Sequence, residues 1–265
     1  MIARPSPPGR LIRFAVLAAL PGVVQAVTTR EAGSLGFAPG DEPAAVRRRR
    51  RALAEALEIE PRQLVCAEQV HGAVVARVGA GERERGAWSR ADAIPGADAL
   101  ITDEPGVFPL LLFADCVPIL LVDPRRRAVG LAHAGWRGTA RAIAARTVEA
   151  MRAELGCEPA DLRAGIGPSI RGCCYEVSGD VAEAVLLAAP AGAEPAADRI
   201  VRPGRSRRPR VDLAAANRAQ LLAAGLLPEN VELSEDCTSC RVDRFFSHRA
   251  ERGEAGRQAA IVGRL

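Results

Sequence analysis

Short apolar segments, separated by polar stretches that often contain glycine or proline, follow one another as far as residue 166. Segments of this length and character predict β-strands. We expect eight strands, at residues 23–28, 64–70, 74–78, 99–102, 109–114, 119–122, 128–132 and 163–166.

A 3.6-residue apolar period predicts helices, most of them later in the chain. The clearest begins near Thr139, a good N-cap, and continues to Leu155. Two others follow Ser178 and Asp212, and a fourth covers residues 44–57.

Strands outnumber helices in the first half of the chain and interleave with them later. This order is typical of an α/β fold in which mixed β-sheets are layered with α-helices. Two long polar segments, 79–96 and 190–209, are expected to be functional or mobile loops. Because we find neither an internal repeat nor a clear linker, we expect residues 1–265 to form a single domain.

Composition excludes several classes of enzyme. All 36 residues counted as Lys or Arg are arginine. The absence of lysine excludes a Walker-A phosphate loop, a pyridoxal-phosphate Schiff base and any lysine nucleophile. The only histidines are His71, His133 and His248, too few for a multidomain blue-copper oxidase.

The net charge of +4 is spread along the chain, so we expect no nucleic-acid partner. The basic run at residues 47–51 lies between Val46, Leu53 and Leu57, which are spaced like one face of a helix. This spacing predicts that the arginine run forms a solvated helix face.

Seven irregularly spaced cysteines in a chain of this length favour a reducing compartment over a disulfide scaffold. One feature points instead to export, since Arg4, Arg10 and Arg13 precede an apolar run at 14–20. Residues 24–26 also resemble a signal-peptidase site. No later stretch approaches a membrane span, and we expect no membrane partner.

Three candidate chemical groups stand where predicted strands end. His71 is followed by glycine, Cys116 follows Asp115 and precedes a proline, and His133 opens a tight turn before a helix. Open α/β sheets place ligands along such an edge. Two imidazoles and a thiolate would make a zinc site with one open position, which copper can also occupy. Taken singly, each residue is equally compatible with a buried core position.

The turn after His133 also predicts an anion site. Arg137 and the unpaired backbone N–H groups of a helix starting near Thr139 would attract phosphate or carboxylate. Near the C-terminus, Arg249, Arg257 and His248 add two guanidiniums and an imidazole. The alternative is that these arginines extend along the surface with their charges in water.

Two further motifs are weak. Cys237 and Cys240 form one CxxC pair without a second, so a structural zinc ribbon lacks half its ligands and a loop-borne thiol pair is expected. The glycine-containing segments 79–81 and 165–167 do not complete a dinucleotide-binding fingerprint, so dinucleotide binding is unsupported.

An ordered set of motifs spanning about residues 20–262 closely resembles the laccase-domain (polyphenol-oxidase-like) family. The matching motifs are Thr28-Thr29-Arg30, Gly40-Asp41-Glu42-Pro43, QVHG at 69–72, ADAL at 97–100, ADCVPILL at 114–121, HAGWRGT at 133–139, IGPSI at 166–170, CYEV at 174–177, DCT at 236–238, FFSHR at 245–249 and GRQ at 256–258.

The resemblance implies an α/β fold with His71, Cys116 and His133 as metal ligands. It implies phosphorolysis of adenosine, inosine and methylthioadenosine, and hydrolytic deamination of adenosine. An older label for the family rests on copper-dependent oxidation of phenols. The resemblance also implies that residues 20–30 form the opening strand of the fold, which argues against export and for a cytoplasmic protein.

We also assign roles to the other candidate residues. The catalytic candidates are Cys116, Asp115 as a general acid or base because it neighbours Cys116, and Arg137. Substrate-binding candidates are Arg30, Gln69, Arg249, Arg257 and His248.

The chain departs from the family's pattern at three places. Ser34 stands where an asparagine is usual, and Arg49-Arg50 replaces an Asn-Arg pair. These two changes put some N-terminal contacts in question. His248 replaces a tyrosine, which is expected to change the pocket's hydrogen bonding or its pH response.

Three functions remain open at this stage. The first is a zinc-dependent purine nucleoside phosphorylase and adenosine deaminase, a monomer or small homo-oligomer whose partners are purine nucleosides and phosphate. The second is a copper-dependent phenol oxidase. The third is a non-catalytic binding module with a structural metal, which would need a fourth ligand from Cys237, Cys240 or His248.

Overall fold

The computed structural model describes residues 11–37, 41–190, 197–204 and 208–265. One sheet orders its strands β1 (Leu11–Ile12), β2 (Val23–Thr28), β13 (Gln258–Arg264), β6 (Phe108–Phe113) and β3 (Leu64–Val65). A second orders them β12 (Val231–Leu233), β9 (Arg163–Ile166), β7 (Val117–Asp123), β8 (Ala128–Ala134), β5 (Ala99–Thr102) and β4 (Val75–Arg77). A small third sheet pairs β10 (Val201–Arg202) with β11 (Arg210–Val211).

Both large sheets mix parallel and antiparallel pairs. In the six-stranded sheet, β7 pairs antiparallel with β8 and β9, whereas β12 runs parallel to β9 and β4 parallel to β5. The helices are α1 (Ala15–Ala18), α2 (Pro43–Ala56), α3 (Trp136–Ala140), α4 (Ile143–Leu155), α5 (Gly179–Leu187), α6 (Ala197–Ile200) and α7 (Leu213–Ala223). Single 3₁₀ turns occur at Arg30–Ala32, Pro61–Gln63, Ala80–Glu82, Pro159–Asp161 and Pro228–Asn230.

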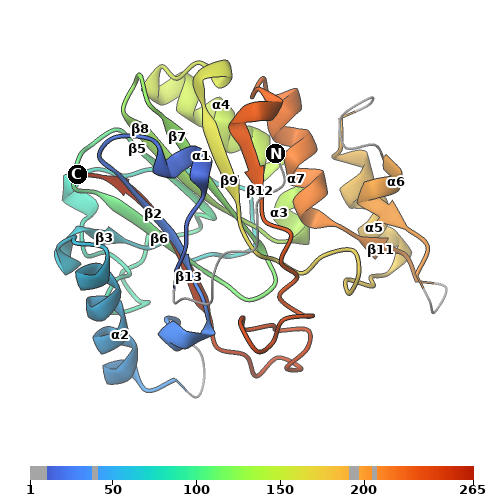
Figure 1. The fold of residues 1–265 in the computed structure, drawn as a ribbon, viewed down its shortest axis with the longest axis horizontal. Helices are drawn as coiled ribbons and strands as arrows, with labels where there is room; N and C mark the ends of the chain where they lie inside the picture. The colour runs from blue at the N-terminus through green and yellow to red at the C-terminus, as the bar shows by residue number, and fades with distance from the viewer. Residues whose placement is uncertain (1–10, 38–40, 191–196, 205–207) are drawn as a thin grey trace.

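The two large sheets pack face to face, with α2 outside one and α3, α4 and α7 outside the other (Figure 1). The short helix α1 contacts strands of both sheets. Between the sheets, Leu111 of β6 and Leu120 of β7 belong to one buried cluster. On the outer face of the five-stranded sheet, Leu110 packs with Leu53 of α2. Leu121, whose side chain leaves β7 on the opposite side from Leu120, packs with α4 and α7. Strands β7 and β8 are buried along their whole length, because both faces of their sheet are covered.

The predicted mixed α/β layering is confirmed, and each predicted strand overlaps an observed one. The strand expected at 64–70 ends at Val65, since the backbone turns before His71. The helix expected from Thr139 is wrong in its start, because α3 is capped by Gly135. It is also interrupted at Ala142, whose left-handed φ of 56° separates α3 from α4. Strand β13, which lies between β2 and β6, had no sequence prediction.

The loop expected at 190–209 is only partly correct. Residues 197–200 form α6, and the next two residues form β10. Residues 191–196 and 205–207 of this segment lie outside the described residues.

The expectation of a solvated arginine run is wrong for Arg50. Its side chain is almost fully buried, with an exposed fraction of 1%. The guanidinium donates to the backbone oxygens of Leu35, Gly86 and Ala87 at 2.8–2.9 Å. These carbonyls come from loops distant in sequence, so local spacing on the helix gives no sign of this burial.

No helix in the described part of the chain has the length and apolarity needed to cross a membrane. Residues 23–28 form β2, paired with both β1 and β13, so a strand does lie within 20–30, but it is not the opening one because β1 and α1 precede it. Arg4 and Arg10 of the suggested leader lie outside the described residues.

Candidate metal centre

The structure brings His71, Cys116 and His133 together. Their ligand atoms all lie within 4.8 Å of one another. The β7–β8 ladder pairs Val117 with Ala134, which places Cys116 and His133 at the same end of two neighbouring strands. His71 comes from the segment between β3 and β4, and its ring lies 4.9 Å from that of His133, centroid to centroid.

Asp98 orients both histidines, and the sequence analysis did not assign it a role. Its buried carboxylate accepts the backbone N–H groups of His71 at 3.0 Å and Gly72 at 2.6 Å. It also lies 2.9 Å from His133 Nδ1. Burial alone would raise the pKa of Asp98, but these hydrogen bonds outweigh it and lower the pKa. An ionised Asp98 accepts a hydrogen bond from Nδ1–H of His133, so Nε2 of His133 is the nitrogen left for a metal.

The backbone conformation around the site allows the three donors to approach one another closely. A Cβ atom at Gly135 would lie 3.0 Å from Cys116 Sγ and 3.2 Å from the His71 ring, so a larger residue would crowd the donors. His71 and Asp115 adopt left-handed φ angles of 59° and 88°, conformations that cost free energy in residues other than glycine.

This donor set fits a divalent metal of the zinc or copper type. Within the described ranges, no fourth His, Cys, Asp or Glu joins the group, which leaves one coordination position for a small ligand. Cys237 and Cys240 belong to a different cluster, and His248 is not among these donors. The fourth ligand that a purely structural site would need is therefore not supplied by any of the three predicted residues.

Charge coupling between Cys116 and His133 prepares the site for a metal. Burial raises the pKa of Cys116, but the charge and hydrogen bond of His133 outweigh it and lower the pKa to about 6. Burial opposes the charged form of His133, yet the Cys116 thiolate and Asp98 raise its pKa to about 9. Without a metal, the two groups therefore form a thiolate–imidazolium pair at neutral pH.

This pair predicts how metal affinity depends on pH. A metal needs the thiolate of Cys116 and neutral His133, so binding between pH 6 and 9 displaces one proton, from His133. We expect the affinity of this centre for Zn²⁺ to rise about tenfold per pH unit over that range and to level off above pH 9. Competition with a chromogenic chelator measures it, and an affinity independent of pH between 6.5 and 8.5 would contradict the expectation.

Replacing the orienting carboxylate tests its role separately. Asp98→Asn is expected to weaken metal binding about 10–100-fold at pH 9, where proton competition is small, because the His133 ring and the His71 backbone lose their acceptor. Asp103→Asn is the matched control, since Asp103 lies just beyond the other end of β5 and pairs with Arg77 on the surface. Equal affinities for the two variants would show that Asp98 does not orient the ligands.

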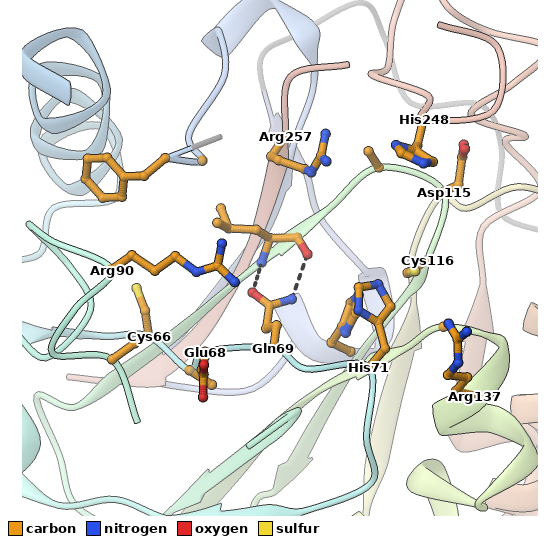
Figure 2. Close-up of a pocket in the computed structure, with 18 of the residues that line it drawn as sticks. Cys66, Glu68, Gln69, His71, Arg90, Asp115, Cys116, Arg137, His248 and Arg257 are labelled. Atoms are coloured by element: carbon orange, nitrogen blue, oxygen red, sulfur yellow. Dashed lines mark hydrogen bonds between the residues drawn. The ribbon is translucent and has the colours of Figure 1, made fainter. Parts of the chain in front are cut away.

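The three donors open into a cavity of about 500 Å³. Six further residues from the sequence predictions line it: Gln69, Asp115, Arg137, His248, Arg249 and Arg257. Figure 2 shows the side chains of Arg137 and Arg90 on opposite sides of His71 in this view. The loop predicted at 79–96 contributes Gly86, Arg90 and Ala93 to the wall.

The cavity carries excess positive charge. In the described part of the chain, no carboxylate forms an ion pair with any of four lining guanidiniums, which belong to Arg90, Arg137, Arg249 and Arg257. The acidic residues found in its lining are Glu68 and Asp115. Such a basic cavity is suited to an anion. Arg90 has no sequence motif that would have identified it.

Two predicted substrate contacts have other partners in this structure. The Gln69 side-chain amide accepts from the backbone N–H of Leu112 and donates to its carbonyl, at 2.9 and 2.8 Å (Figure 2). Arg30 is not in the cavity lining. Its guanidinium donates to the carbonyl of Phe245 and to Glu251, which fastens the C-terminal segment to the end of β2.

Asp115 lies beside Cys116 at the cavity wall, but both carboxylate oxygens have structural partners. Oδ1 accepts a hydrogen bond from the hydroxyl of Thr238 at 2.6 Å, and Oδ2 accepts one from the backbone N–H of Arg249 at 2.7 Å.

The predicted anion site at Thr139 needs correction, because the Thr139 N–H donates to the carbonyl of Gly135. The anion argument at this turn therefore rests on the Arg137 guanidinium.

Two aromatic residues complete the cavity beside these arginines. The Arg137 guanidinium lies 4.5 Å from the centroid of Trp136, and that of Arg249 lies 5.0 Å from the centroid of Tyr175. Burial raises the pKa of Tyr175 to about 12, so it is a neutral phenol at physiological pH. Both residues line the cavity and pack against the adjacent hydrophobic core.

Comparisons with known proteins agree with this geometry. Residues 21–265 match the family described as multi-copper polyphenol oxidoreductase laccase. The chain is 43% identical over 252 residues to the purine nucleoside phosphorylase YlmD of Geobacillus stearothermophilus, covering 92% of this chain and 90% of that protein. It is 35% identical to a purine nucleoside phosphorylase of Bacteroides thetaiotaomicron, with 94% of each chain covered.

Two solved structures share the fold. The crystal structure of YlmD from Geobacillus stearothermophilus aligns with a TM-score of 0.90 at 39% identity, covering 98% of both chains. The hypothetical protein YfiH of Bacillus licheniformis aligns with a TM-score of 0.86 at 35% identity, covering 92% of this chain and 93% of that one.

Proposed function

Because the chain belongs to the multi-copper polyphenol oxidoreductase laccase family, whose relatives named above are purine nucleoside phosphorylases, we propose that it is a purine nucleoside phosphorylase. Adenosine, inosine and methylthioadenosine are the proposed substrates with phosphate. The same cavity deaminates adenosine, and zinc is bound by His71, Cys116 and His133.

One observation carries this proposal: the three metal donors line the same cavity as four guanidiniums that pair with no carboxylate of the described residues. Phosphorolysis needs a site for a phosphate dianion beside the sugar, and a laccase acting on a neutral phenol does not. Trp136 and Tyr175 add aromatic surface to the cavity wall, which the purine would contact.

In phosphorolysis, a phosphate oxygen forms a bond to C1′ of the ribose while the bond from C1′ to N9 of the purine breaks. The electron pair of that bond goes to the base, which takes up a proton, and ribose 1-phosphate remains. Arg137 and Arg249 orient the phosphate and balance its charge. Asp115 is the proposed proton-transfer residue, since each carboxylate oxygen keeps a lone pair beyond its structural hydrogen bond.

Deamination replaces the amino group at C6 of adenosine by oxygen and releases ammonia. Zinc in a three-ligand site supplies a nucleophilic water at neutral pH by lowering its pKa to about 7. Asp98 holds His133 in the tautomer that leaves Nε2 free for the metal. The cavity walls would place C6 of the purine close to the three metal donors.

The proposal is tested by incubating the purified chain with adenosine, with and without phosphate, and separating the products. Phosphorolysis gives adenine only when phosphate is present, whereas deamination gives inosine in both reactions. Hypoxanthine is expected with phosphate as the inosine is consumed. Formation of neither free base nor inosine by the zinc-loaded chain would reject the function.

A copper-dependent phenol oxidase is the second candidate, and the affinity of a His₂Cys donor set for copper favours it. Three histidines cannot build a trinuclear oxygen-reducing centre, so we expect this activity to be slow. Phenol oxidation that depends on added copper, without purine turnover in the zinc form, would favour this alternative.

A further inference from the structure

A second cluster of metal donors lies outside the cavity. The Sγ atoms of Cys173, Cys174, Cys237 and Cys240 all lie within 4.8 Å of one another. Cys240 Sγ is 3.3 Å from that of Cys174 and 3.5 Å from that of Cys173. The CxxC pair that lacked half its ligands in the sequence thus finds the other half in the adjacent cysteines 173 and 174.

The fold brings the two pairs together through backbone pairing. Strands β9 and β12 are parallel neighbours, so the segments that follow them leave the same edge of the sheet. A bridge between Ser169 and Cys237 extends this pairing, and the Thr238 N–H donates to the Ser169 carbonyl at 3.1 Å. The meeting of the four thiols is therefore set by the sheet register, not by chance proximity of two loops.

The spacing of the sulfurs matches a tetrahedral metal site. A zinc–thiolate bond of about 2.3 Å places the sulfurs of a tetrahedron about 3.8 Å apart. Cys240 Sγ lies 3.3 and 3.5 Å from the sulfurs of Cys174 and Cys173, and all four sulfurs lie within 4.8 Å of one another, distances close to this value. A disulfide joins two sulfurs at about 2.05 Å and would leave the other two thiols of this group without a function. We propose that Cys173, Cys174, Cys237 and Cys240 bind a structural zinc ion.

Backbone N–H groups favour the thiolate form of one cysteine in the cluster. The Arg171 N–H lies 3.4 Å from Cys237 Sγ. Burial would raise the pKa of Cys237, but hydrogen bonds from the backbone of Arg171 and Cys240 outweigh it and lower the pKa. The hydrogen bond with Cys174 raises the pKa of Cys240 to about 11. Zinc binding would displace the thiol protons of the cluster.

The cluster fastens two loops that form one wall of the cavity. Thr238, between the two CxxC cysteines, donates its hydroxyl to Asp115. Ile170, shortly before Cys173, donates its N–H to the Asp115 carbonyl at 2.9 Å. A four-cysteine zinc has no open coordination position, so its role is to hold these loops rather than to react. The proposal of this site does not depend on which reaction the cavity catalyses.

The test is a metal count on the full chain purified in reducing buffer and loaded with Zn²⁺. We expect two zinc ions per chain, one of which is lost in Cys240→Ser and the other in Cys116→Ala. The double variant should hold none. Cys157→Ala is the matched control, because Cys157 is a buried cysteine that belongs to neither cluster. This variant should keep both ions.

Spectroscopy identifies the ligands independently of the count and of activity. Co²⁺ bound to Cys116→Ala should give the thiolate-to-metal charge transfer and intense visible bands of a tetrahedral four-sulfur site. If Cys240→Ser fails to fold, alkylation of Cys116→Ala provides the second readout. Zinc should then protect Cys173, Cys174, Cys237 and Cys240, and a chelator should expose them.

Three results would overturn the proposal. The first is a single zinc ion per chain that disappears entirely in Cys116→Ala. The second is an intact mass showing a disulfide among the four cysteines in protein kept under reducing conditions. The third is rapid alkylation of Cys173 and Cys240 in the zinc-loaded chain.

Discussion

Cys116→Ala is expected to lose the metal bound by His71 and His133 and nearly all phosphorolysis and deamination, while the chain stays folded. Cys116 supplies the only thiolate of this donor group. Loss of a partner that merely orients a ligand typically costs about 10–100-fold in metal affinity or activity, so loss of a ligand itself should cost more. The fold should persist, because the substitution removes one sulfur atom at the cavity wall from sheets packed on both faces.

The measurement combines metal content, purine turnover and thermal unfolding, with Cys157→Ala as the control for removal of a buried thiol. Zinc content should fall by one ion per chain in Cys116→Ala only. Retention of full zinc content with normal turnover would refute the ligand assignment. An unfolded Cys116→Ala protein would indicate instead that this metal is structural.

Arg137→Ala is expected to raise the phosphate KM by roughly 10- to 150-fold, which corresponds to loss of one charge-assisted hydrogen bond of about 1.5–3 kcal/mol. The Arg137 side chain is exposed to the cavity and stacks on Trp136. No carboxylate of the described residues pairs with it, so its charge is available to an anion. Zinc content should not change, because Arg137 is not a metal donor.

Two further variants serve as comparisons for Arg137→Ala. Arg137→Lys keeps the charge but loses the planar fork, so it should give an intermediate KM. Arg152→Ala on α4 removes an exposed arginine outside the cavity lining and should leave KM unchanged. An unchanged phosphate KM in Arg137→Ala would exclude Arg137 as a phosphate-binding residue. Arg249 or Arg257 would then be assigned that role.

The sequence predicts the core strands and the metal donors because both leave local signals. Continuous apolar runs mark β7 and β8, which are buried on both faces. Cys116 and His133 each follow such a run, two residues before a proline or a glycine, and His71 is followed directly by a glycine. Pairing of β7 with β8 brings Cys116 and His133 together, whereas His71 reaches them from the segment between β3 and β4, where Asp98 accepts its backbone N–H.

Features that depend on contacts between distant segments could not be predicted this way. Arg50 is buried because three backbone carbonyls from distant loops surround its guanidinium. Strand β13 is rich in small residues and became recognisable only through its pairing with β2 and β6. The partners of Cys237 and Cys240 lie more than sixty residues earlier, and only the register of β9 and β12 reveals them.

Phosphorus NMR of the zinc-loaded chain with inosine and phosphate tests the central claim most directly, because it identifies the group that accepts the ribose. The account predicts a ribose 1-phosphate signal that grows in step with hypoxanthine and is absent when Cys116→Ala replaces the intact chain. Hypoxanthine accompanied by free ribose, or the same signal from Cys116→Ala, would contradict it.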